Sequence, residues 1–160
     1  MLHLEKINKN NVWDIINLKV KKSQKEFVAT NEESIIEAYT TITANGHVFP
    51  FGIYEKKIPV GFLMIAFGTD DYWESAPKIA KNNYNLWRFM IDRKWQNRGF
   101  GKEALKLALS FIKTYPSGKA EYCWLSYESD NEVAKHLYHS FGFKETGDMD
   151  DREVIAIMKL

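Results

Sequence analysis

The chain has 160 residues, of which 45% are hydrophobic and 27% are charged, and this length and composition suit a single domain over residues 1–160. Its formal net charge of +1 gives no electrostatic reason to expect nucleic acid as the main partner. It has no apolar run of about 18 residues and no apolar segment after Met1 typical of a secretion signal, so no membrane partner is expected and the predicted location is cytoplasmic. A single cysteine, Cys123, excludes an internal disulfide and a thiolate metal cluster, and the four histidines lack metal-ligand spacing, so no metal is expected.

The first third of the chain predicts one strand and two helices. Residues 2–7 predict a short strand, and residues 12–20 carry apolar side chains at roughly helical spacing. Thr30 and Glu33 match the capping box that begins a helix, and Asn45-Gly46 marks its end. The apolar residues of this second helix are Ile35, Ile36, Tyr39 and Ile42.

The middle of the chain predicts a hairpin followed by a long connection. Residues 48–54 and 60–67 are rich in β-branched and aromatic side chains and flank the polar turn 55–57, so they should pair as two strands. Residues 68–83 are polar and include Pro77. This segment is long for a connection inside a small domain, which indicates a functional loop that is helical in part.

The second half of the chain predicts β-α-β units. Residues 85–92 become continuously apolar, as in a strand covered on both faces, and residues 100–115 form an amphipathic helix that ends at Pro116 and Gly118. The remaining predicted elements are a strand at 121–127, a helix at 131–141, and strands near 143–149 and 152–159. This order predicts an α+β fold without an internal repeat or linker.

The turn from Gln96 to Gly101 joins a strand to a helix and fits a phosphate-binding device. The first N–H groups of a helix lack partners and its dipole favours an anion, and Gly99 and Gly101 let the backbone approach closely. Arg98 and Lys102 add cationic side chains where a pyrophosphate or ribose phosphate would lie. Two glycines before a helix are also common in plain structural turns.

Two nucleotide-binding motifs do not fit this turn. A P-loop has four residues between its glycines and then Gly-Lys-Ser/Thr, whereas here the glycines are two apart and Lys102 precedes Glu103. A dinucleotide fingerprint requires three glycines and an acidic residue after the next strand, and only Gly99 and Gly101 match it.

The turn instead resembles the pattern Gln/Arg-x-x-Gly-x-Gly/Ala of the Gcn5-related N-acetyltransferase (GNAT) superfamily, met by Gln96, Gly99 and Gly101 after the strand at 88–92. A second motif resembles the family's last helix and the turn after it, and consists of Asn131, Ala134, Leu137-Tyr138 and Phe141-Gly142-Phe143. The resemblance implies a mixed, mostly antiparallel sheet of about seven strands flanked by helices. It also implies acetyl-CoA bound between two splayed central strands, and direct acetyl transfer to an amine.

Within that superfamily the chain is most similar to the bacterial spermine/spermidine acetyltransferases. The similar stretches are residues 87–92 leading into Gln96, and residues 125–128 leading into Asn131. There is one departure. Some polyamine acetyltransferases place a glutamate in the strand before the loop, and here that strand holds Leu86-Trp87-Arg88.

The last helix carries the expected acid of the reaction. Asn131, Ala134, Lys135 and Tyr138 fall on one helix face. By resemblance, Asn131 binds the pantetheine arm and Tyr138 protonates the departing thiolate; taken alone, these residues also fit a helix cap and a half-buried aromatic. An alkylamine is mostly protonated at pH 7, so a proton acceptor or a water chain is needed, and Glu128 is the first candidate for the acceptor. A solvated loop carboxylate without a catalytic role explains Glu128 at least as well.

The backbone of Met90 and Ile91 is expected to pair with pantetheine as an added strand and to polarise the thioester carbonyl. The full set of expected acetyl-CoA contacts is Met90, Ile91, Gln96, Arg98, Gly99, Phe100, Gly101, Lys102, Asn131, Lys135 and Tyr138.

An acidic and aromatic cluster in the long loop is the expected amine site, because carboxylates and ring faces attract polycations. It comprises Asp70, Asp71, Tyr72, Trp73 and Glu74, with Glu32 and Glu33 from the other side. A solvated loop and the first turn of a helix explain these residues equally well. The expected partner is a small-molecule amine, first of all a polyamine. Another small amine or a protein amine is an alternative substrate, and a non-catalytic acyl-CoA-binding module is an alternative function. A homodimer is compatible with the sequence.

Overall fold

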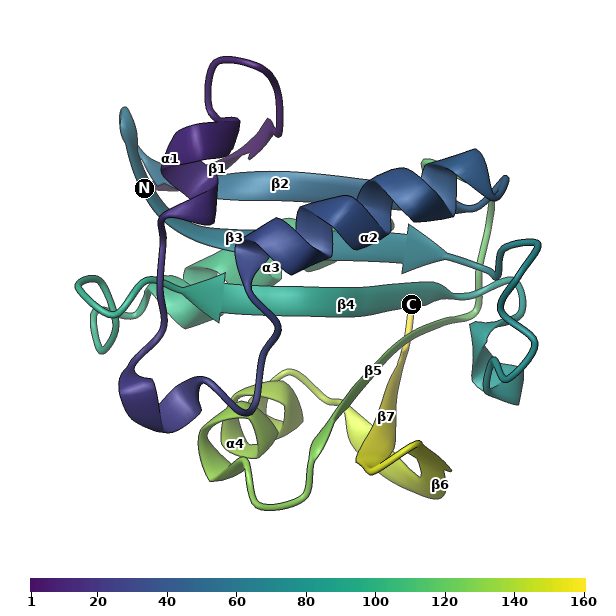
Figure 1. The fold of residues 1–160 in the computed structure, drawn as a ribbon. Coiled ribbons are helices and arrows are strands. Elements are labelled where there is room, and N and C mark those ends of the chain that lie inside the picture. Colours follow the sequence, from purple (N-terminus) through teal and green to yellow (C-terminus); the bar gives the residue numbers. More distant parts are fainter.

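The computed structural model describes residues 1–160 and contains one seven-stranded sheet with helices on both faces (Figure 1). The strands are β1 (Leu2–Lys6), β2 (His47–Glu55), β3 (Ile58–Phe67), β4 (Tyr84–Ile91), β5 (Tyr122–Glu128), β6 (Lys144–Asp150) and β7 (Glu153–Lys159). The helices are α1 (Val12–Ile16), α2 (Asn31–Thr43), α3 (Phe100–Ile112) and α4 (Glu132–Ser140), with 3-10 turns η1 (Lys22–Gln24) and η2 (Lys78–Ala80).

The strand order is β1-β2-β3-β4-β5-β7-β6, and every neighbouring pair is antiparallel except β4 and β5. The predicted mixed, mostly antiparallel sheet flanked by helices is therefore confirmed. None of the helices combines the length and the apolar character needed to cross a membrane.

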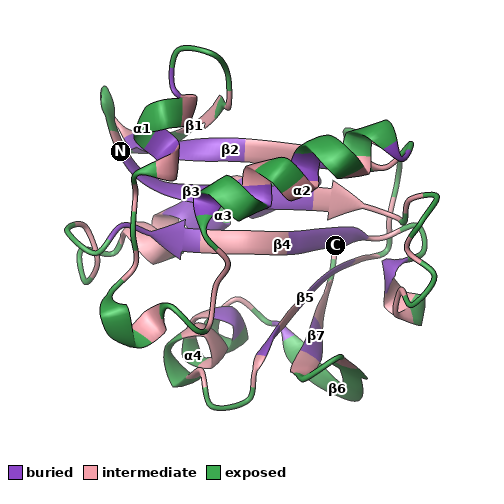
Figure 2. Cartoon of the chain, in the orientation of Figure 1, coloured by how far each residue is buried: buried purple, intermediate pink, exposed green.

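Alternation along the central strands divides the core between the two faces of the sheet. On β3, Leu63 and Ile65 join the cluster that includes Leu105 of α3, whereas Phe62 and Met64 join the cluster that includes Ile15 of α1. Successive strand residues point to opposite faces, so α3 covers one face and α1 and α2 cover the other. Figure 2 shows the resulting buried strands beneath the exposed outer side of α2.

The helix predicted over residues 12–20 is wrong in its extent, because α1 ends at Ile16. The backbone of Lys19 bonds to the chain after β4: its N–H donates to Asp92 Oδ2 at 2.8 Å, and its carbonyl accepts from the Arg93 N–H at 2.8 Å. These two bonds replace the helical ones that residues 17–20 would make, and they hold the following segment beside the end of β4.

Apolar side chains on the first two helices are also less buried than helical spacing alone suggests. Ile36, Tyr39 and Ile42 of α2 are 54–69% exposed, and Trp13 of α1 is 70% exposed. Only the inner side of each helix meets the sheet, through residues such as Ile15 and Ala38.

Strands β4 and β5 pair only at their first residues. Tyr84 lies opposite Cys123 and Asn85 opposite Trp124, and beyond these pairs the two strands diverge (Figure 1). The divergence leaves the β5-facing edge of the rest of β4 without a strand partner. A gap therefore opens in the middle of the sheet.

A β-bulge beside this gap changes the direction of the β4 side chains. Met64 pairs with Arg88 and Ile65 with Leu86, so Trp87 is the extra residue. Leu86 consequently belongs to the α3-side core, whereas Arg88 points to the α2 side and binds Glu37 of α2 at 2.9 Å. Bulges of this kind re-aim side chains near functional sites.

Candidate active site

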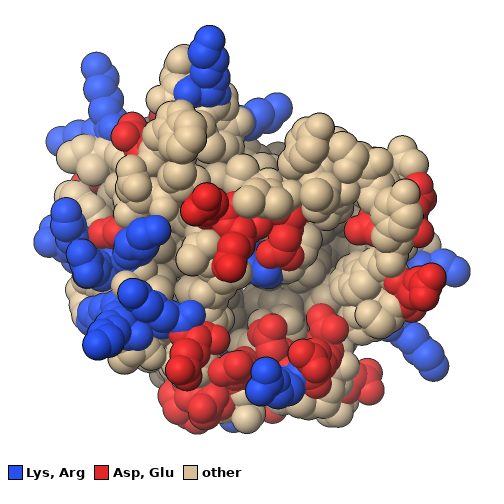
Figure 3. Space-filling model, in the orientation of Figure 1, with Lys and Arg blue, Asp and Glu red and all other residues tan.

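The gap between β4 and β5 is the centre of a cavity of about 1200 Å³. Its walls come from the end of β3 and the loop after it at 68–73, from β4 and β5, from the segment 20–30, from the inner side of α2, from α4, and from the β6–β7 hairpin. In Figure 3 the cavity is the hollow in the middle of the face, with acidic side chains on both sides of it and basic side chains gathered beyond one end. This charge separation indicates two subsites, one that favours anionic groups and one that favours cationic groups.

The unpaired edge of β4 gives one wall of the cavity hydrogen-bonding capacity. Met90 and Ile91 both line the cavity, and neither has a partner on β5. The carbonyl of Ile91 accepts from Gln96 Nε2 at 3.0 Å, which ties the following turn to the end of the strand. An extended amide-bearing chain can add to such an edge as a further strand.

The turn before α3 presents backbone N–H groups at the cavity's basic end. Asn97 and Gly99 have φ values of 61° and 80°, and Gly99 caps α3 without any side-chain hydrogen bond. The N–H groups of residues 99–102 find no acceptor within the protein. Left-handed positions within such a turn gather N–H groups into a concave anion site, and the helix dipole favours negative charge there.

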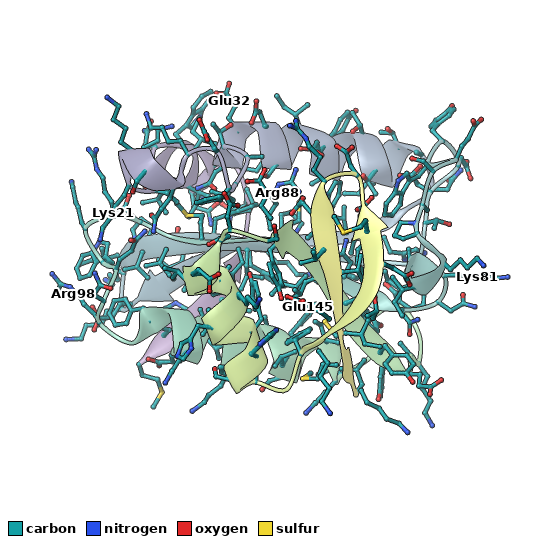
Figure 4. All side chains as sticks on the ribbon, turned by 90° about the horizontal axis from the view of Figure 1, so that it is seen from below. Lys21, Glu32, Lys81, Arg88, Arg98 and Glu145 are labelled. Carbon is teal, nitrogen blue, oxygen red and sulfur yellow. The ribbon has the colours of Figure 1, made fainter.

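The side chains around this turn divide between structural and exposed positions. Gln96 uses both of its amide protons within the protein, the second on Gln24 Oε1 at 2.8 Å. The Arg98 guanidinium lies 4.9 Å from the centre of the Trp95 ring, at the outer edge of the molecule (Figure 4). Lys102 is exposed at the first turn of α3. Gln96 therefore shapes the turn, and Arg98 and Lys102 stand outside the cavity wall.

The structure brings together about half of the predicted acetyl-CoA contacts as cavity-lining residues. Those that line the cavity are Met90, Ile91, Gln96, Gly101, Asn131 and Tyr138, and those outside its wall are Arg98, Gly99, Phe100, Lys102 and Lys135. Lys135 points instead toward β6, where its Nζ lies 3.7 Å from Glu145 Oε1. Sequence analysis missed Lys21 and Lys25, which line the basic end from a segment that carries no motif.

Asn131 and Tyr138 place α4 against the gap. The Asn131 side chain caps α4 by accepting from the Ala134 N–H at 3.3 Å, which leaves its amide protons free. Tyr138 is only 9% exposed and packs against Tyr127 and Phe143, with ring centres 5.9 Å apart in both pairs. Its hydroxyl has no protein partner but keeps contact with the cavity. Burial, and then the charge of Glu153, raise the pKa of Tyr138 above its usual range.

The cavity wall away from the basic end is acidic. The carboxylates of the whole cavity are Glu26, Glu33, Glu37, Asp70, Glu128, Asp150 and Glu153, and of these only Glu26 lies beside Lys25 on the segment 20–30. Arg88 is the one cationic side chain among them; it is 19% exposed, and Figure 4 shows it at the centre of the molecule, between α2 and the β6–β7 hairpin. Its Nε is buried without a partner.

The predicted amine site is only partly assembled. Asp70, Tyr72, Trp73 and Glu33 line the cavity, whereas Asp71, Glu74 and Glu32 do not. Asp71 accepts from Asn45 Nδ2 at 2.6 Å, so the end of α2 binds its side chain. Glu32 points outward from α2 (Figure 4). A helix and a tight loop each turn only one side toward the cavity. A run of acidic residues in the sequence does not show which of its members lie on that side.

Besides Lys21 and Lys25, five charged residues of the wall were missed from the sequence, and two of them left a signal. The five are Glu26, Glu37, Arg88, Asp150 and Glu153. Glu37 follows Glu33 by one helical turn, so the two share a face of α2, and Arg88 is a lone charge in an apolar strand. Asp150 and Glu153 flank the turn of the last hairpin, and nothing local shows that this turn reaches the centre of the molecule.

The divided sheet, the anion-binding turn and the buried tyrosine are those of an acyl-CoA-dependent acetyltransferase. A family model, the Acetyltransferase (GNAT) family, matches residues 13–143, and the chain belongs to this family. Acetyl-CoA is the co-substrate of the family.

Named relatives agree with this assignment. The spermine/spermidine N(1)-acetyltransferase of Bacillus subtilis is 27% identical over 154 residues, which cover 93% of this chain and 91% of the relative. Spermidine N-acetyltransferase from Vibrio cholerae, solved with CoA and spermine, is 17% identical with a TM-score of 0.67, over 99% of this chain and 94% of that one. An aminoglycoside acetyltransferase solved with coenzyme A is 12% identical with a TM-score of 0.77, over 99% and 95%. Both structures share the fold.

Proposed function

We propose that the protein transfers the acetyl group of acetyl-CoA to a primary amine of a polyamine such as spermine or spermidine. The observation that carries this proposal is the cavity itself, because six of its seven carboxylates share the wall with a single arginine, away from the segment that carries Lys21 and Lys25. A flexible chain with several ammonium groups fits such a wall through favourable charge at each position. The relative from Bacillus subtilis, named for spermine and spermidine, supports the same substrate class.

The residues of the cavity divide the chemical work. Bound acetyl-CoA supplies an acetyl group activated as a thioester. The free edge of β4 at Met90 and Ile91 orients the thioester carbonyl and stabilises the charge that develops on its oxygen. As the amine nitrogen bonds to the carbonyl carbon and the carbon–sulfur bond breaks, the Tyr138 hydroxyl gives its proton to the sulfur. The amine in turn must lose a proton.

Thiol release from acetyl-CoA across a panel of amines tests this function. The panel contains spermine, spermidine, a monoamine, an aminoglycoside and a lysine-containing peptide. We expect spermine and spermidine to give the highest kcat/KM. Coenzyme A binding with no amine-dependent release from any member would show a non-catalytic module, and a preference for the aminoglycoside or the peptide would move the substrate class.

Charge at Asp70 is expected to contribute to polyamine binding. Asp70 Oδ1 accepts from the Tyr72 and Trp73 N–H groups at 2.8 and 3.0 Å, and an asparagine oxygen can accept the same bonds. Asp70→Asn therefore removes charge and keeps the turn. We expect the KM for spermine to rise about threefold, in keeping with a partly exposed charge pair, and the KM for a monoamine to change less.

Asp148→Asn, on the exposed outer strand β6 and outside this cavity, is the matched control for the loss of one carboxylate. Initial rates against spermine and propylamine at two salt concentrations measure the difference, which should shrink at high salt because exposed charges are screened. Equal effects of Asp70→Asn on both amines would remove this loop from polyamine recognition.

A further inference from the structure

The proposed reaction leaves open which group takes the proton from the amine. The acceptor nitrogen of an alkylamine is mostly protonated near pH 7 and cannot attack until it loses that proton. Strand β4 offers no carboxylate at the gap, since Arg88 occupies the wall there. The proton acceptor must therefore come from another element.

Three carboxylates on the α2 side of the cavity are already engaged. Glu33 Oε2 accepts from the Thr30 N–H at 3.0 Å as part of the cap of α2, and Glu37 binds Arg88. Asp70 holds two N–H groups of its own loop. Glu26 and His47 are exposed at the rim. These bonds occupy carboxylate oxygens of Glu33, Glu37 and Asp70 that would otherwise be free to accept a proton.

The remaining three carboxylates form a row across the other side of the gap. Glu128 of β5 lies directly opposite Glu153 of β7, which lies opposite Asp150 of β6. Opposed residues in antiparallel strands project from the same face, so all three point the same way. None of the three makes a hydrogen bond within the protein. The chain contains no group of His, Cys, Asp and Glu arranged to hold a metal ion.

Glu153, in the middle of this row, faces the reaction from the side opposite Tyr138. Alternation places Glu153 on the face of β7 that carries Ile155, in the small core with Trp124, whereas Tyr138 belongs to the core under α3. The two residues thus approach the gap from opposite faces of the sheet. They are close enough for the charge of Glu153 to raise the pKa of Tyr138. Such a pair can hold a base and an acid on either side of one reacting carbon.

The surroundings of Glu153 also strengthen it as a base. Burial raises its pKa; the neighbouring charges of Asp150, Glu128 and Asp151 act in the same direction, and Arg88 acts against them. A carboxylate with a raised pKa binds a proton more readily near neutral pH.

We propose that Glu153 is the proton acceptor for the attacking amine, with Glu128 and Asp150 beside it holding the substrate's ammonium groups. This inference rests on the proposed acetyl transfer and assigns its missing step. The ammonium gives one proton to Glu153, and the free nitrogen then bonds to the carbonyl carbon. As the carbon–sulfur bond breaks, the sulfur receives the proton of Tyr138, and the nitrogen releases its second proton to solvent to leave a neutral amide. Glu153 then loses its proton to solvent and Tyr138 regains one from it, so that the whole reaction releases one proton.

Glu153→Gln, assayed with two amines, tests the assignment. Spermine binds as an ammonium and must give a proton to Glu153 before it attacks. 2,2,2-Trifluoroethylamine is already neutral at pH 7.5, because its fluorines lower the amine pKa, and does not need that first proton transfer. We expect kcat/KM for spermine to fall about tenfold, less than for an isolated general base because Glu128 and Asp150 stand nearby, and kcat/KM for trifluoroethylamine to stay within about twofold. Glu121→Gln, at the far end of β5 and outside the cavity, is the matched control.

The outcomes separate this inference from the function itself. An unchanged kcat/KM for spermine, or equal losses with both amines, would overturn the role of Glu153 while leaving acetyl transfer intact. Absence of amine-dependent release by the unmodified protein would instead overturn the proposed function. The pH profile of kcat/KM with spermine gives a second readout. We expect its acidic limb to have an apparent pKa above the usual carboxyl range and to disappear in Glu153→Gln. An acidic limb unchanged by the substitution would also count against Glu153.

The same substitution is expected to stabilise the fold at neutral pH. A carboxyl whose pKa is higher in the folded than in the unfolded protein stabilises the fold below its unfolded pKa, and that contribution is lost as pH rises through the folded pKa. Glu153 is such a group, so ionisation at pH 7.5 costs stability and Glu153→Gln removes that cost. We expect a higher Tm at pH 7.5 and a smaller difference at pH 4. A lower Tm at pH 7.5 would show that Glu153 is held as a structural anion.

Discussion

Replacement of Tyr138 by phenylalanine is expected to lower kcat for acetyl transfer about 10²-fold while leaving the affinity for acetyl-CoA nearly unchanged. The substitution deletes one hydroxyl that has no partner in the protein, so packing against Tyr127 and Phe143 is kept. A positioned proton donor contributes about 10²-fold or more to a transfer of this kind. Loss of kcat without loss of binding is the mark of an interaction made only in the transition state.

The raised pKa of Tyr138 gives this prediction its pH dependence. A phenol whose pKa lies above its usual value near 10 stays protonated through the whole neutral range. The Tyr138 proton has no acceptor on the sulfur until the carbon–sulfur bond breaks and negative charge develops there. We therefore expect the wild-type kcat to show no loss from Tyr138 ionisation up to about pH 9.

Thiol release under saturating spermine and calorimetric titration with coenzyme A measure the two quantities. Tyr39→Phe, at a site on α2 that is 69% exposed, is the matched control and should behave as wild type. Wild-type turnover by Tyr138→Phe would remove this residue from the mechanism. A parallel loss of coenzyme A affinity would show that the hydroxyl serves binding instead.

The parts of the fold that could be predicted are those whose signals are local. The turn from Gln96 to Gly101 and the cap at Thr30 depend on neighbouring residues, and both lie where the sequence places them. The β-branched and aromatic residues in 60–67 likewise predict β3, because such side chains favour a strand wherever it lies. These elements in order predicted an α+β fold, and the resemblance to the GNAT superfamily supplied the mixed, mostly antiparallel sheet.

Contacts between distant segments account for what the sequence could not show. The helix at 12–20 ends early because Asp92 and Arg93, more than 70 residues away, bind the backbone of Lys19. Glu153 reaches the cavity because β7 pairs with β5 rather than with β6 alone, so that it lies beside Glu128. Neither partner can be identified from residues near it in sequence.

Replacement of Gly101 by valine is expected to weaken coenzyme A binding about 10²-fold without unfolding the protein. Gly101 lines the cavity in the first turn of α3, where the N–H groups of residues 99–102 have no acceptor. A valine side chain would extend toward Leu137 of α4, across the path of the pyrophosphate to these groups. Hydrogen bonds to charged groups contribute about 1.5–3 kcal/mol each, so losing two of them costs about 3 kcal/mol or more, which is at least 10²-fold in Kd.

Gly101→Ala is the matched control, because a methyl group at this position fits. A Cβ there would lie 3.7 Å from Leu137 Cδ2, an ordinary contact, and alanine favours a helix over glycine by about 1 kcal/mol. We expect the alanine variant to bind coenzyme A within about threefold of wild type and to show an equal or higher Tm. The valine variant should keep its Tm within a few degrees and lose binding. Tight binding of coenzyme A by the valine variant would place the pyrophosphate away from the start of α3. A lower Tm for the alanine variant would show that a glycine is needed at position 101 for packing, and not to let the pyrophosphate reach the backbone N–H groups.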